Sequence, residues 1–568
     1  RKLRAVAGEL GKVDPAAMFE ALRGKDFQYQ YFPSNCLIEL DEEPPRDMNE
    51  KALDITLILS KMLHASIADE IHTMRKIVTD GSNTSAFQRT ALVGRNGYLD
   101  TSKGKVSIDN ISVEEESAGI VEKQNKYAVY RLDRLGIPLV EIGTGPDIKD
   151  PEHAQEVAEK IGMLIRSTGK SQRGIGSTRQ DVNVSIRGGN RIEIKGVQEL
   201  GMIKIMIDNE IQRQKNLIQL PKQIGKVKLR EPEEVTGIFD DTKCEFIKKI
   251  VKRNGTIYGM VLPNMTGLLG KELCSGKTLG RELADYAVSH GVKGMIHSDE
   301  DLKKYKIEPD FEEMSILLKR KENDAVMIIA GDEEALRAIN AVKDRLAILI
   351  KGIVPKETRA ANPDGTTRYT RPLPGSGRMY PETDLKPIKV DKKYLKTLKL
   401  PETLEAKAKR YKKIIPKDMV GQILRSEYLE FFENNNKKYD ATLIANIITS
   451  LLKDLRRNGV KTENITDEHL LQVLDMYKKK TIVKEAIPTV LESIAKNPNL
   501  NVSQALDKTG IKSMTEKELD KIIDDVFKNN PKLVEEKKMS ALMGDVMKVV
   551  RGRISGKIVA KKISERLK

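Results

Sequence analysis

The sequence predicts an α+β protein with several domains, in which a mixed or antiparallel sheet precedes a helical C-terminal part. Its 568 residues are enough for roughly three to five domains. Residues 176–198 alternate apolar and polar side chains in two arms, which is typical of an antiparallel hairpin. Residues 233–355 mix apolar runs with amphipathic helices, and almost every pattern from about residue 400 onward is helical.

The hairpin is expected to have one apolar face and one polar face. A three-residue loop at 188–190 would pair Asn183 with Lys195 and Ser185 with Glu193, which keeps both faces uniform. A hairpin whose polar face meets only water is the equally common alternative. The candidate catalytic residues on the polar face are Asp181, Asn183, Ser185, Glu193 and Lys195.

Two further predicted strands carry acidic residues that could hold a metal ion. The first ends in three consecutive acids, and strand alternation places Glu114 and Glu115 on opposite faces, so at most one of these faces lines a site. The second carries Glu141 inside an apolar run, where a carboxylate needs a partner. That partner is either a hard cation such as Mg²⁺ or a salt bridge to Arg131 or Arg134.

Residues 70–90 gather polar side chains around Gly81 and are expected to form a loop. Loops of this kind can present donors to a phosphate or a carboxylate. An ordinary loop histidine is an equally good interpretation of His72. The candidate nucleotide-binding or substrate-binding residues are His72, Arg75, Lys76, Asp80, Ser82 and Gln88, together with Arg179 ahead of the hairpin.

Residues 356–390 are rich in proline and glycine. Arg368, Arg371 and Arg378 in this segment could approach phosphates across a flexible loop. A linker between domains, with solvated arginines, explains the same composition equally well.

The chain is strongly basic, with 99 Lys and Arg against 83 Asp and Glu and a formal net charge of +16. The excess is mostly lysine, which favours contact with phosphate over reading of bases. Residues 531–568 carry 11 Lys or Arg against 4 Asp or Glu. We expect this helical tail to contact RNA phosphates, and a solvated charged face is the alternative. The candidate tRNA-binding residues are Lys548, Arg551, Arg553 and Lys557.

Several classes of protein are disfavoured by the sequence. Cys36, Cys244 and Cys274 are far apart, which argues against a disulfide framework or a zinc site and favours a reducing cytoplasm. No apolar run approaches the roughly 20 residues that span a bilayer, so no membrane partner is expected. The sequence also has no P-loop and no Gly-x-Ser-x-Gly nucleophile elbow.

Four segments together resemble a known family. VEEESAG, RLDRLGIPLVEIGTGPDI, GSTRQDVNVSI and IEIKGVQEL are similar to segments of the GatB/GatE family, the tRNA-binding kinase and transamidase subunits of tRNA-dependent amidotransferases. The C-terminal stretch resembles the family's tail domain, which is related to the YqeY module. Residues 233–355 are similar to the insertion domain of bacterial aspartyl-tRNA synthetases, and with TMRKIVTDGSNTSAFQRT they point to the archaeal branch of the family.

The resemblance implies a domain order and a reaction. It implies a cradle domain at 1–232 and 356–395, an aspartyl-tRNA synthetase-like insertion at 233–355, a helical domain at 396–485 and a tail at 486–568. The γ-carboxylate of Glu-tRNA(Gln) would take a phosphoryl group from ATP, and ammonia would then displace phosphate to give Gln-tRNA(Gln). An asparaginase-like D subunit would supply the ammonia, in a heterotetramer of two D and two E subunits. A non-catalytic tRNA-binding scaffold is the main alternative, and an aminoacyl-tRNA synthetase is a weaker one.

The resemblance also implies roles for individual residues. Glu114 and Glu141 match metal-binding acids of the family, with Glu115 beside them, and Mg²⁺ is the expected ion. Asp181, Asn183 and Lys195 match residues of its active-site sheet, and we expect Lys195 to contact phosphate or acyl phosphate. The family's first strand also carries a Gly-Leu-Glu-x-His motif whose histidine binds the metal. The printed sequence begins after that motif, so the metal site is expected to need a residue ahead of Arg1.

Overall fold

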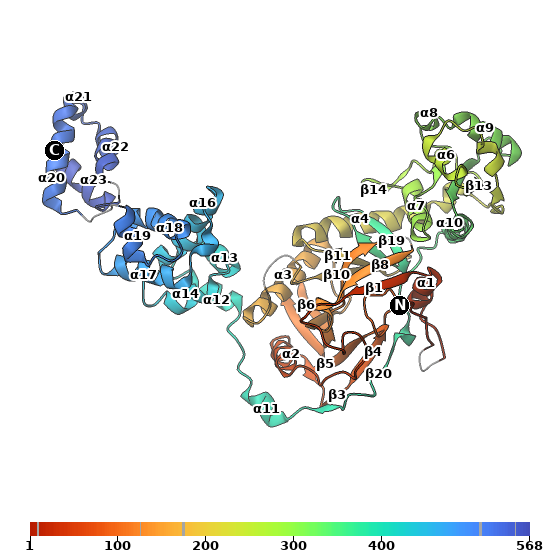
Figure 1. The fold of residues 1–568 in the computed structure, drawn as a ribbon, viewed down its shortest axis with the longest axis horizontal. Helices are drawn as coiled ribbons and strands as arrows, with labels where there is room; N and C mark the ends of the chain where they lie inside the picture. The colour runs from red at the N-terminus through yellow and green to blue at the C-terminus, as the bar shows by residue number, and fades with distance from the viewer. Residues whose placement is uncertain (8–10, 125, 173–175, 510–513, 551, 568) are drawn as a thin grey trace. The chain divides into compact units, whose positions relative to one another are not determined.

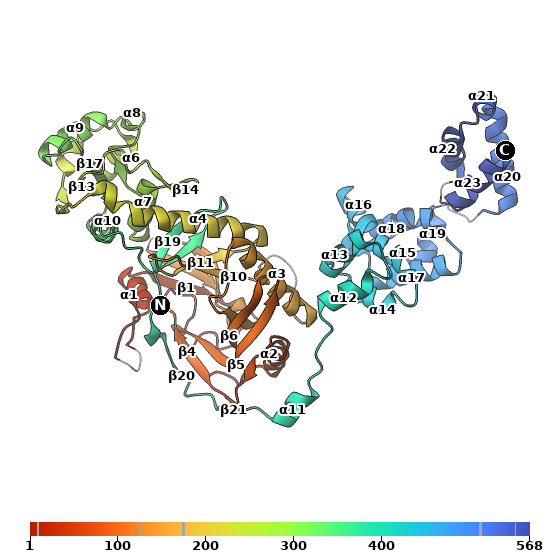
Figure 2. The ribbon, with the colours of Figure 1, turned by 180° about the vertical axis from the view of Figure 1, so that it is seen from behind.

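The computed structural model describes residues 1–7, 11–124, 126–172, 176–509, 514–550 and 552–567. The chain divides into two compact units, Arg1–Pro401 and Glu402–Lys568. The first unit contains every sheet found in the described residues, and the second is helical (Figures 1 and 2). The prediction of an α+β chain with a helical C-terminal part is therefore confirmed. None of the helices in the described ranges combines the length and the apolar character that crossing a bilayer requires.

A six-stranded antiparallel sheet is the largest sheet of the first unit. Helices α2 (Glu50–Met62) and α3 (Pro151–Ser167) pack against it, and their apolar side chains fill the core beside the sheet. The strand order is β20-β4-β5-β6-β9, with β2 paired to β5. The bounds are Met379–Pro381 for β20, Thr73–Ile77 for β4, Phe87–Thr101 for β5, Gly104–Glu115 for β6, Pro138–Thr144 for β9 and Ser66–Ile67 for β2.

The predicted hairpin forms half of a four-stranded sheet. Its arms are β10 (Gln180–Val184) and β11 (Ile192–Val197), and helix α4 (Leu200–Gln219) packs on their apolar face. The other half consists of β18 (Glu357–Ala361) and β19 (Thr367–Pro372), with β11 and β18 running parallel. The interpretation of residues 356–390 as a linker is therefore wrong, because this segment supplies strands to three sheets.

The predicted register of the hairpin is wrong by two residues. Asn183 lies opposite Glu193 rather than Lys195, and Ser185 follows the end of β10 and is exposed. The loop is longer than expected because α4 holds it, with Asn190 N donating to Gln214 Oε1 at 3.3 Å. A shift of two residues preserves side-chain alternation, so the apolar and polar faces are the ones the sequence predicts.

Residues 233–355 contain a second antiparallel sheet with its own helices. Thr278 caps α7 (Leu279–Ser289) by accepting a hydrogen bond from Arg281 N. The strand order is β12-β13-β17-β16, with bounds Glu233–Glu234, Thr256–Leu262, Ala325–Gly331 and Ile296–His297. A two-stranded sheet of β14 (Glu272–Cys274) and β15 (Lys277–Thr278) lies beside it. The helices of this module are α6 (Glu245–Val251), α7, α8 (Leu302–Tyr305), α9 (Glu308–Leu317) and α10 (Ala335–Leu349), and the short helix α5 (Pro221–Ile224) precedes it.

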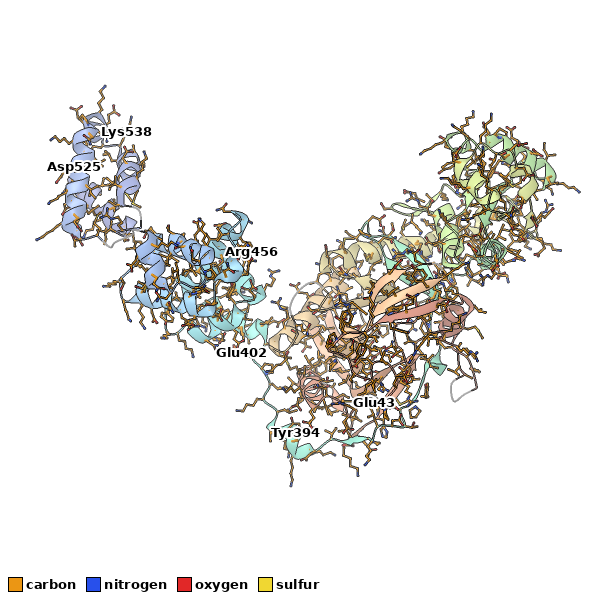
Figure 3. The ribbon with its side chains drawn as sticks, viewed as in Figure 1. Glu43, Tyr394, Glu402, Arg456, Asp525 and Lys538 are labelled. Carbon is orange, nitrogen blue, oxygen red and sulfur yellow. The ribbon has the colours of Figure 1, made fainter. Side chains whose placement is uncertain are left out.

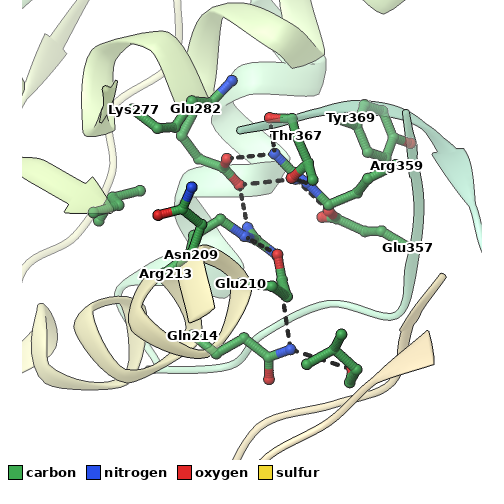
Figure 4. A network of polar contacts seen from close by, with 12 residues as sticks. Asn209, Glu210, Arg213, Gln214, Lys277, Glu282, Glu357, Arg359, Thr367 and Tyr369 are labelled. Atoms are coloured by element: carbon green, nitrogen blue, oxygen red, sulfur yellow. Dashed lines mark hydrogen bonds and ion pairs between the residues drawn. The ribbon is translucent and has the colours of Figure 1, made fainter. Parts of the chain in front are cut away.

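A fully buried network of charged side chains joins this module to the hairpin sheet (Figure 4). Glu282 on α7 accepts hydrogen bonds from Arg213 on α4 at 2.7 Å and from Arg359 on β18 at 2.9 Å. Arg359 also donates to Glu357 on its own strand at 2.7 Å. The network fixes β18, which lies beside the hairpin arm β11, against the helices of residues 233–355.

A smaller sheet and several short elements complete the first unit. The N-terminal helix α1 (Pro15–Leu22) is capped by the buried side chain of Asp14, which accepts hydrogen bonds from two main-chain N–H groups. Tyr394 on α11 (Lys392–Thr397), which is labelled in Figure 3, donates a hydrogen bond to Asp54 on α2. The small sheet has the order β1-β8-β7, with bounds Asp26–Gln30, Tyr127–Arg131 and Gly119–Lys123, and β3 (Glu70–Ile71) pairs with β21 (Ile388–Lys389).

The second unit consists of short helices. Tyr411 and Phe432 pack edge to face in its core, and Arg410 pairs with Glu402 at 2.7 Å near its start (Figure 3). The helices are α12 (Leu404–Tyr411), α13 (Lys417–Arg425), α14 (Leu429–Asn435), α15 (Ala441–Asn446), α16 (Leu452–Arg457), α17 (Asp467–Lys478), α18 (Ile487–Lys496), α19 (Val502–Thr509), α20 (Glu516–Asn529), α21 (Pro531–Glu535), α22 (Met539–Val550) and α23 (Gly556–Arg566). Thr515 caps α20 by accepting a hydrogen bond from Glu518 N, and Val550 of α22 packs in the core of the tail while Val549 is exposed.

Candidate active site

Two carboxylates from neighbouring strands meet on one face of the six-stranded sheet. Glu141 on β9 pairs with Ser112 on β6, two residues from Glu114, so strand alternation puts both carboxylates on the same face. The other face packs against α2 through Val113. The Lys76 ammonium on β4 hydrogen-bonds to Glu114 and lies 3.9 Å from Glu141 Oε2. We call Glu114 and Glu141 the carboxylate pair.

The carboxylate pair requires a nearby positive charge. Burial is the main cause that raises the pKa of Glu141 to about 7. The hydrogen bond to Glu114 and the negative charge of Glu114 raise it further. Burial also opposes ionisation of Glu114, but the Lys76 charge holds the pKa of that carboxyl below its usual range. Two carboxyl groups this close share a proton near neutral pH unless a cation replaces it.

Neither arginine that the sequence offered as the partner of Glu141 pairs with it. Arg131 pairs with Asp133, and Arg134 Nη2 lies 3.0 Å from Glu116 Oε2. The cation beside Glu141 is instead Lys76, which comes from a strand on the far side of β5 and β6.

The polar face of the hairpin sheet is directed at the same region. Lys195 Nζ lies 2.7 Å from Asp181 Oδ2 and 3.4 Å from Glu193 Oε1. Thr358 on the neighbouring strand donates a hydrogen bond to Glu193 Oε2 at 2.9 Å. The charge of Lys195 acts to lower the pKa of Glu141, so Lys195 is near enough to influence the carboxylate pair.

The third predicted metal ligand does not join the carboxylate pair. Glu115 points to the opposite face of β6, where Arg89 Nη1 lies 3.4 Å from its carboxylate. In the described ranges, no group of three or more His, Cys, Asp or Glu side chains is placed to hold a metal ion. Two carboxylates still suit Mg²⁺, which takes few protein ligands and keeps water and phosphate oxygens in its coordination shell. The raised pKa of Glu141 fits this, because a divalent cation would replace the shared proton.

The loop expected over residues 70–90 is confined to residues 78–86 around Gly81, between β4 and β5, and strand β4 takes up the residues before it. The strand places two of the predicted ligands on opposite faces. Lys76 joins the carboxylate pair, whereas its neighbour Arg75 points away and pairs with Glu382. His72 is exposed and lies 3.1 Å from Glu70. Among these three candidates, only Lys76 therefore lies with the carboxylate pair.

The remaining candidates from this region are engaged within the protein. Asp80 and Ser82 form a turn, in which Asp80 Oδ1 accepts hydrogen bonds from Ser82 N at 3.0 Å and Ser82 Oγ at 2.6 Å. Gln88 donates to a main-chain carbonyl of β6 at 2.6 Å. Arg179 forms an ion pair with Glu116. These contacts stabilise the fold around the carboxylate pair.

Glu382 is a buried residue that the sequence analysis missed. It lies in a proline-rich segment with no pattern to mark it, and its side chain accepts hydrogen bonds from Arg75 and, at 2.8 Å, from Arg89 Nε. Although burial opposes ionisation, these hydrogen bonds lower the pKa of Glu382 from 4.5 to about 2. Glu382 therefore stays ionised at neutral pH and ties β20 to β4 and β5.

The low pKa of Glu382 predicts an acid-sensitive contribution to stability. A carboxylate whose pKa is depressed on folding stabilises the protein above its unfolded pKa of 4.5, and this stabilisation is lost as the pH falls toward about 2. Glu382→Gln should therefore be less stable at pH 7 and should lose less stability than the parent between pH 4.5 and 2. Thermal unfolding measured at several pH values checks this, and parallel pH profiles for the two proteins would contradict it.

Two of the four tRNA-binding residues predicted in the tail are exposed to solvent. Lys557 is exposed at the start of α23, and Lys548 is exposed and pairs with Asp545 at 2.8 Å. Arg553 is half-buried, and its carbonyl accepts a hydrogen bond from Met514 N at 2.8 Å. Arg551 lies outside the described residues. The tail thus presents Lys548 and Lys557 to solvent.

Comparison with known proteins identifies the family. Residues 36–396 match the family described as the GatB/GatE catalytic domain, and residues 430–567 match the family described as the GatB domain. The chain belongs to the GatB/GatE family. The resemblance seen in the sequence is thus confirmed, as is the expectation of an enzyme.

Several archaeal proteins are similar to this GatB/GatE family member along its whole length. The E subunit of a glutamyl-tRNA(Gln) amidotransferase from Methanosarcina acetivorans is 43% identical over 99% of this chain and 90% of its own length. Proteins of the same name from Archaeoglobus fulgidus and Methanocaldococcus jannaschii are 42% and 41% identical over 100% of this chain, and over 92% and 93% of their own lengths. The similarity therefore includes the carboxylate pair, the hairpin sheet and the helical unit.

Proposed function

We propose that this GatB/GatE family member is the E subunit of a Glu-tRNA(Gln) amidotransferase. It would transfer a phosphoryl group from ATP to the γ-carboxylate of Glu-tRNA(Gln) and then pass the activated acyl group to ammonia, releasing phosphate. The observation that carries this proposal is the carboxylate pair with Lys76 beside it, together with Lys195 on the polar hairpin face, whose charge acts on Glu141. Phosphoryl transfer needs this combination, because it depends on charge compensation and positioning.

Each side chain of the cluster has a definite task in this proposal. Glu114 and Glu141 would hold Mg²⁺, which when bound compensates the charge of the ATP phosphates. Lys195 would contact the phosphoryl group during transfer and the acyl phosphate afterwards, where a fixed cation stabilises the developing charge. Asp181 and Glu193 hold the Lys195 ammonium in place. Burial acts to lower the pKa of Lys195, but the charges of these two carboxylates outweigh burial and raise it, so Lys195 stays charged at neutral pH.

The proposed reaction also requires two partners, a source of ammonia and the tRNA. The relatives are called subunits, and we propose that an asparaginase-like D subunit supplies ammonia in a heterotetramer of two D and two E chains in the cytoplasm. The exposed lysines of α22 and α23 would contact tRNA phosphates.

Free ammonium can replace the ammonia-supplying partner in a direct test. The full-length protein, incubated with Glu-tRNA(Gln), ATP, Mg²⁺ and ammonium chloride, should form Gln-tRNA(Gln), and omission of ATP or Mg²⁺ should stop the reaction. Aminoacyl analysis after deacylation of the tRNA gives the readout. Absence of glutamine when all components are present would refute the catalytic proposal.

A non-catalytic tRNA-binding scaffold is the second candidate, favoured by the net charge of +16. It predicts that Glu141→Ala leaves activity of the assembled enzyme intact while removal of residues 486–568 abolishes it. Loss of activity in Glu141→Ala with unchanged tRNA affinity would exclude the scaffold.

A further inference from the structure

A row of polar residues crosses the whole hairpin sheet from edge to edge. Asn183, Glu193, Thr358 and Arg371 are register partners on β10, β11, β18 and β19. Register partners project from the same face of a sheet, and neighbouring strands lie about 4.8 Å apart. Arg371 therefore stands on the face that carries Lys195, two strands away from Glu193, within the span of its long side chain.

A second arginine follows in the loop after β19. Arg378 ends a short 3-10 helix, Ser376–Arg378, and its Nε donates to the Ile77 carbonyl at the end of β4 at 2.9 Å. Asp14, which is 3% exposed, anchors the loop by accepting a hydrogen bond from Gly375 N at 3.0 Å. Burial and the charge of Arg371 lower the pKa of Arg378, so the two positive charges act on each other.

These two arginines differ from other arginines around the site. Arg75, Arg89 and Arg179 each pair with a carboxylate. Within the described ranges, neither Arg371 nor Arg378 has a carboxylate within 4.0 Å, although both are half-buried. Two neighbouring cations that are partly removed from water and lack a carboxylate partner favour binding of an anion.

We propose that Arg371 and Arg378 bind phosphate groups of the nucleotide beside Lys195. This assignment rests on the proposed function, because it places the polyphosphate between the two arginines and the carboxylate pair. The planar guanidinium group can bind two phosphate oxygens at once, which suits a polyphosphate better than an ammonium does. ATP that has bound one Mg²⁺ keeps a net negative charge, which the two guanidinium groups would neutralise.

The chain offers a matched control on the same strand. Arg368 lies three residues before Arg371 in the sequence but is exposed and donates a hydrogen bond to Asn362 Oδ1. Arg371 is the cleaner test position, because its side chain makes no hydrogen bond with the described residues. Arg378→Lys keeps the charge at the second position but removes the Nε donor to Ile77, so it separates charge from loop anchoring.

The experiment measures binding of Mg·ATP and of AMP to the full chain by calorimetry. Arg371→Gln and Arg378→Gln should each weaken Mg·ATP binding about 10- to 100-fold, while AMP binding, tRNA binding and Arg368→Gln stay within about twofold of the parent. Arg378→Lys should lie between Arg378→Gln and the parent. Mg·ATP binding within twofold of the parent in both glutamine variants would overturn the inference, as would a loss of tRNA affinity with ATP affinity unchanged.

The two proposals fail in different ways. If the parent chain forms Gln-tRNA(Gln) from ammonium but Arg371→Gln binds Mg·ATP normally, only the arginine assignment is wrong. If the parent chain binds no Mg·ATP and forms no Gln-tRNA(Gln), both are wrong.

Discussion

Replacing Lys195 by alanine is expected to lower the rate of Gln-tRNA(Gln) formation by about 10²- to 10³-fold, the cost of removing one fixed group that stabilises transition-state charge. Lys195 is held at 2.7 Å by Asp181 and at 3.4 Å by Glu193, so its ammonium occupies one position before substrate arrives. Rates measured with free ammonium at saturating ATP and tRNA report this effect without the ammonia-supplying partner.

The control for this prediction is Lys103→Ala, which removes an exposed lysine that pairs with Asp150 near the turn between β5 and β6. It should leave the rate within about twofold of the parent, because exposed pairs contribute little. Parental rates in Lys195→Ala would show that the hairpin face does not act in the reaction. Filter binding of tRNA to both variants excludes a loss of substrate affinity as the cause.

Replacing Glu282 by alanine is expected to reduce the free energy of unfolding by about 3–5 kcal/mol, the cost of removing one partner from a buried charge network. Glu282 has no exposed surface and lies 2.7 Å from Arg213 and 2.9 Å from Arg359 (Figure 4). Arg345 lies 3.6 Å from the same carboxylate. Three buried guanidinium groups would lose their shared carboxylate. Because Arg359 belongs to β18, the effect should reach the strand that carries Thr358 beside Glu193.

Hydrogen exchange read out by mass spectrometry tests this locally. Amides of α7 and β18 should exchange faster in Glu282→Ala, because they exchange through unfolding of this region. Glu231→Ala is the matched control, since that carboxylate is exposed and pairs only with Lys343 at 2.7 Å among the described residues. It should change stability by less than about 0.5 kcal/mol. Equal protection in the parent and Glu282→Ala would show that the network does not stabilise the sheet.

The sequence predicts well which face of its strand each site residue occupies. It separates Glu114 from Glu115, and it assigns the polar face of the hairpin to Asp181, Asn183, Glu193 and Lys195. Both results follow from the two-residue period of a strand, which holds wherever the strand lies in the fold.

The sequence does not predict which segments far apart in the chain come into contact. The hairpin register depends on Gln214 of α4, which fixes the loop, and the linker interpretation failed because β18 and β19 join a sheet begun far earlier in the chain. Lys76 reaches the carboxylate pair only because β4 and β9 belong to the same sheet. No local pattern marks such partners, since they are chosen by tertiary packing.

The central claim is that the γ-carboxylate of Glu-tRNA(Gln) is phosphorylated before ammonia attacks it. Glu-tRNA(Gln) carrying heavy oxygen (¹⁸O) in that carboxylate tests the claim directly when the chain converts it with ATP and ammonium. Phosphorylation moves one carboxylate oxygen into the phosphate that ammonia displaces, so inorganic phosphate should carry one ¹⁸O for each Gln-tRNA(Gln) formed. Formation of Gln-tRNA(Gln) with unlabelled phosphate, or with the label in AMP, would contradict it.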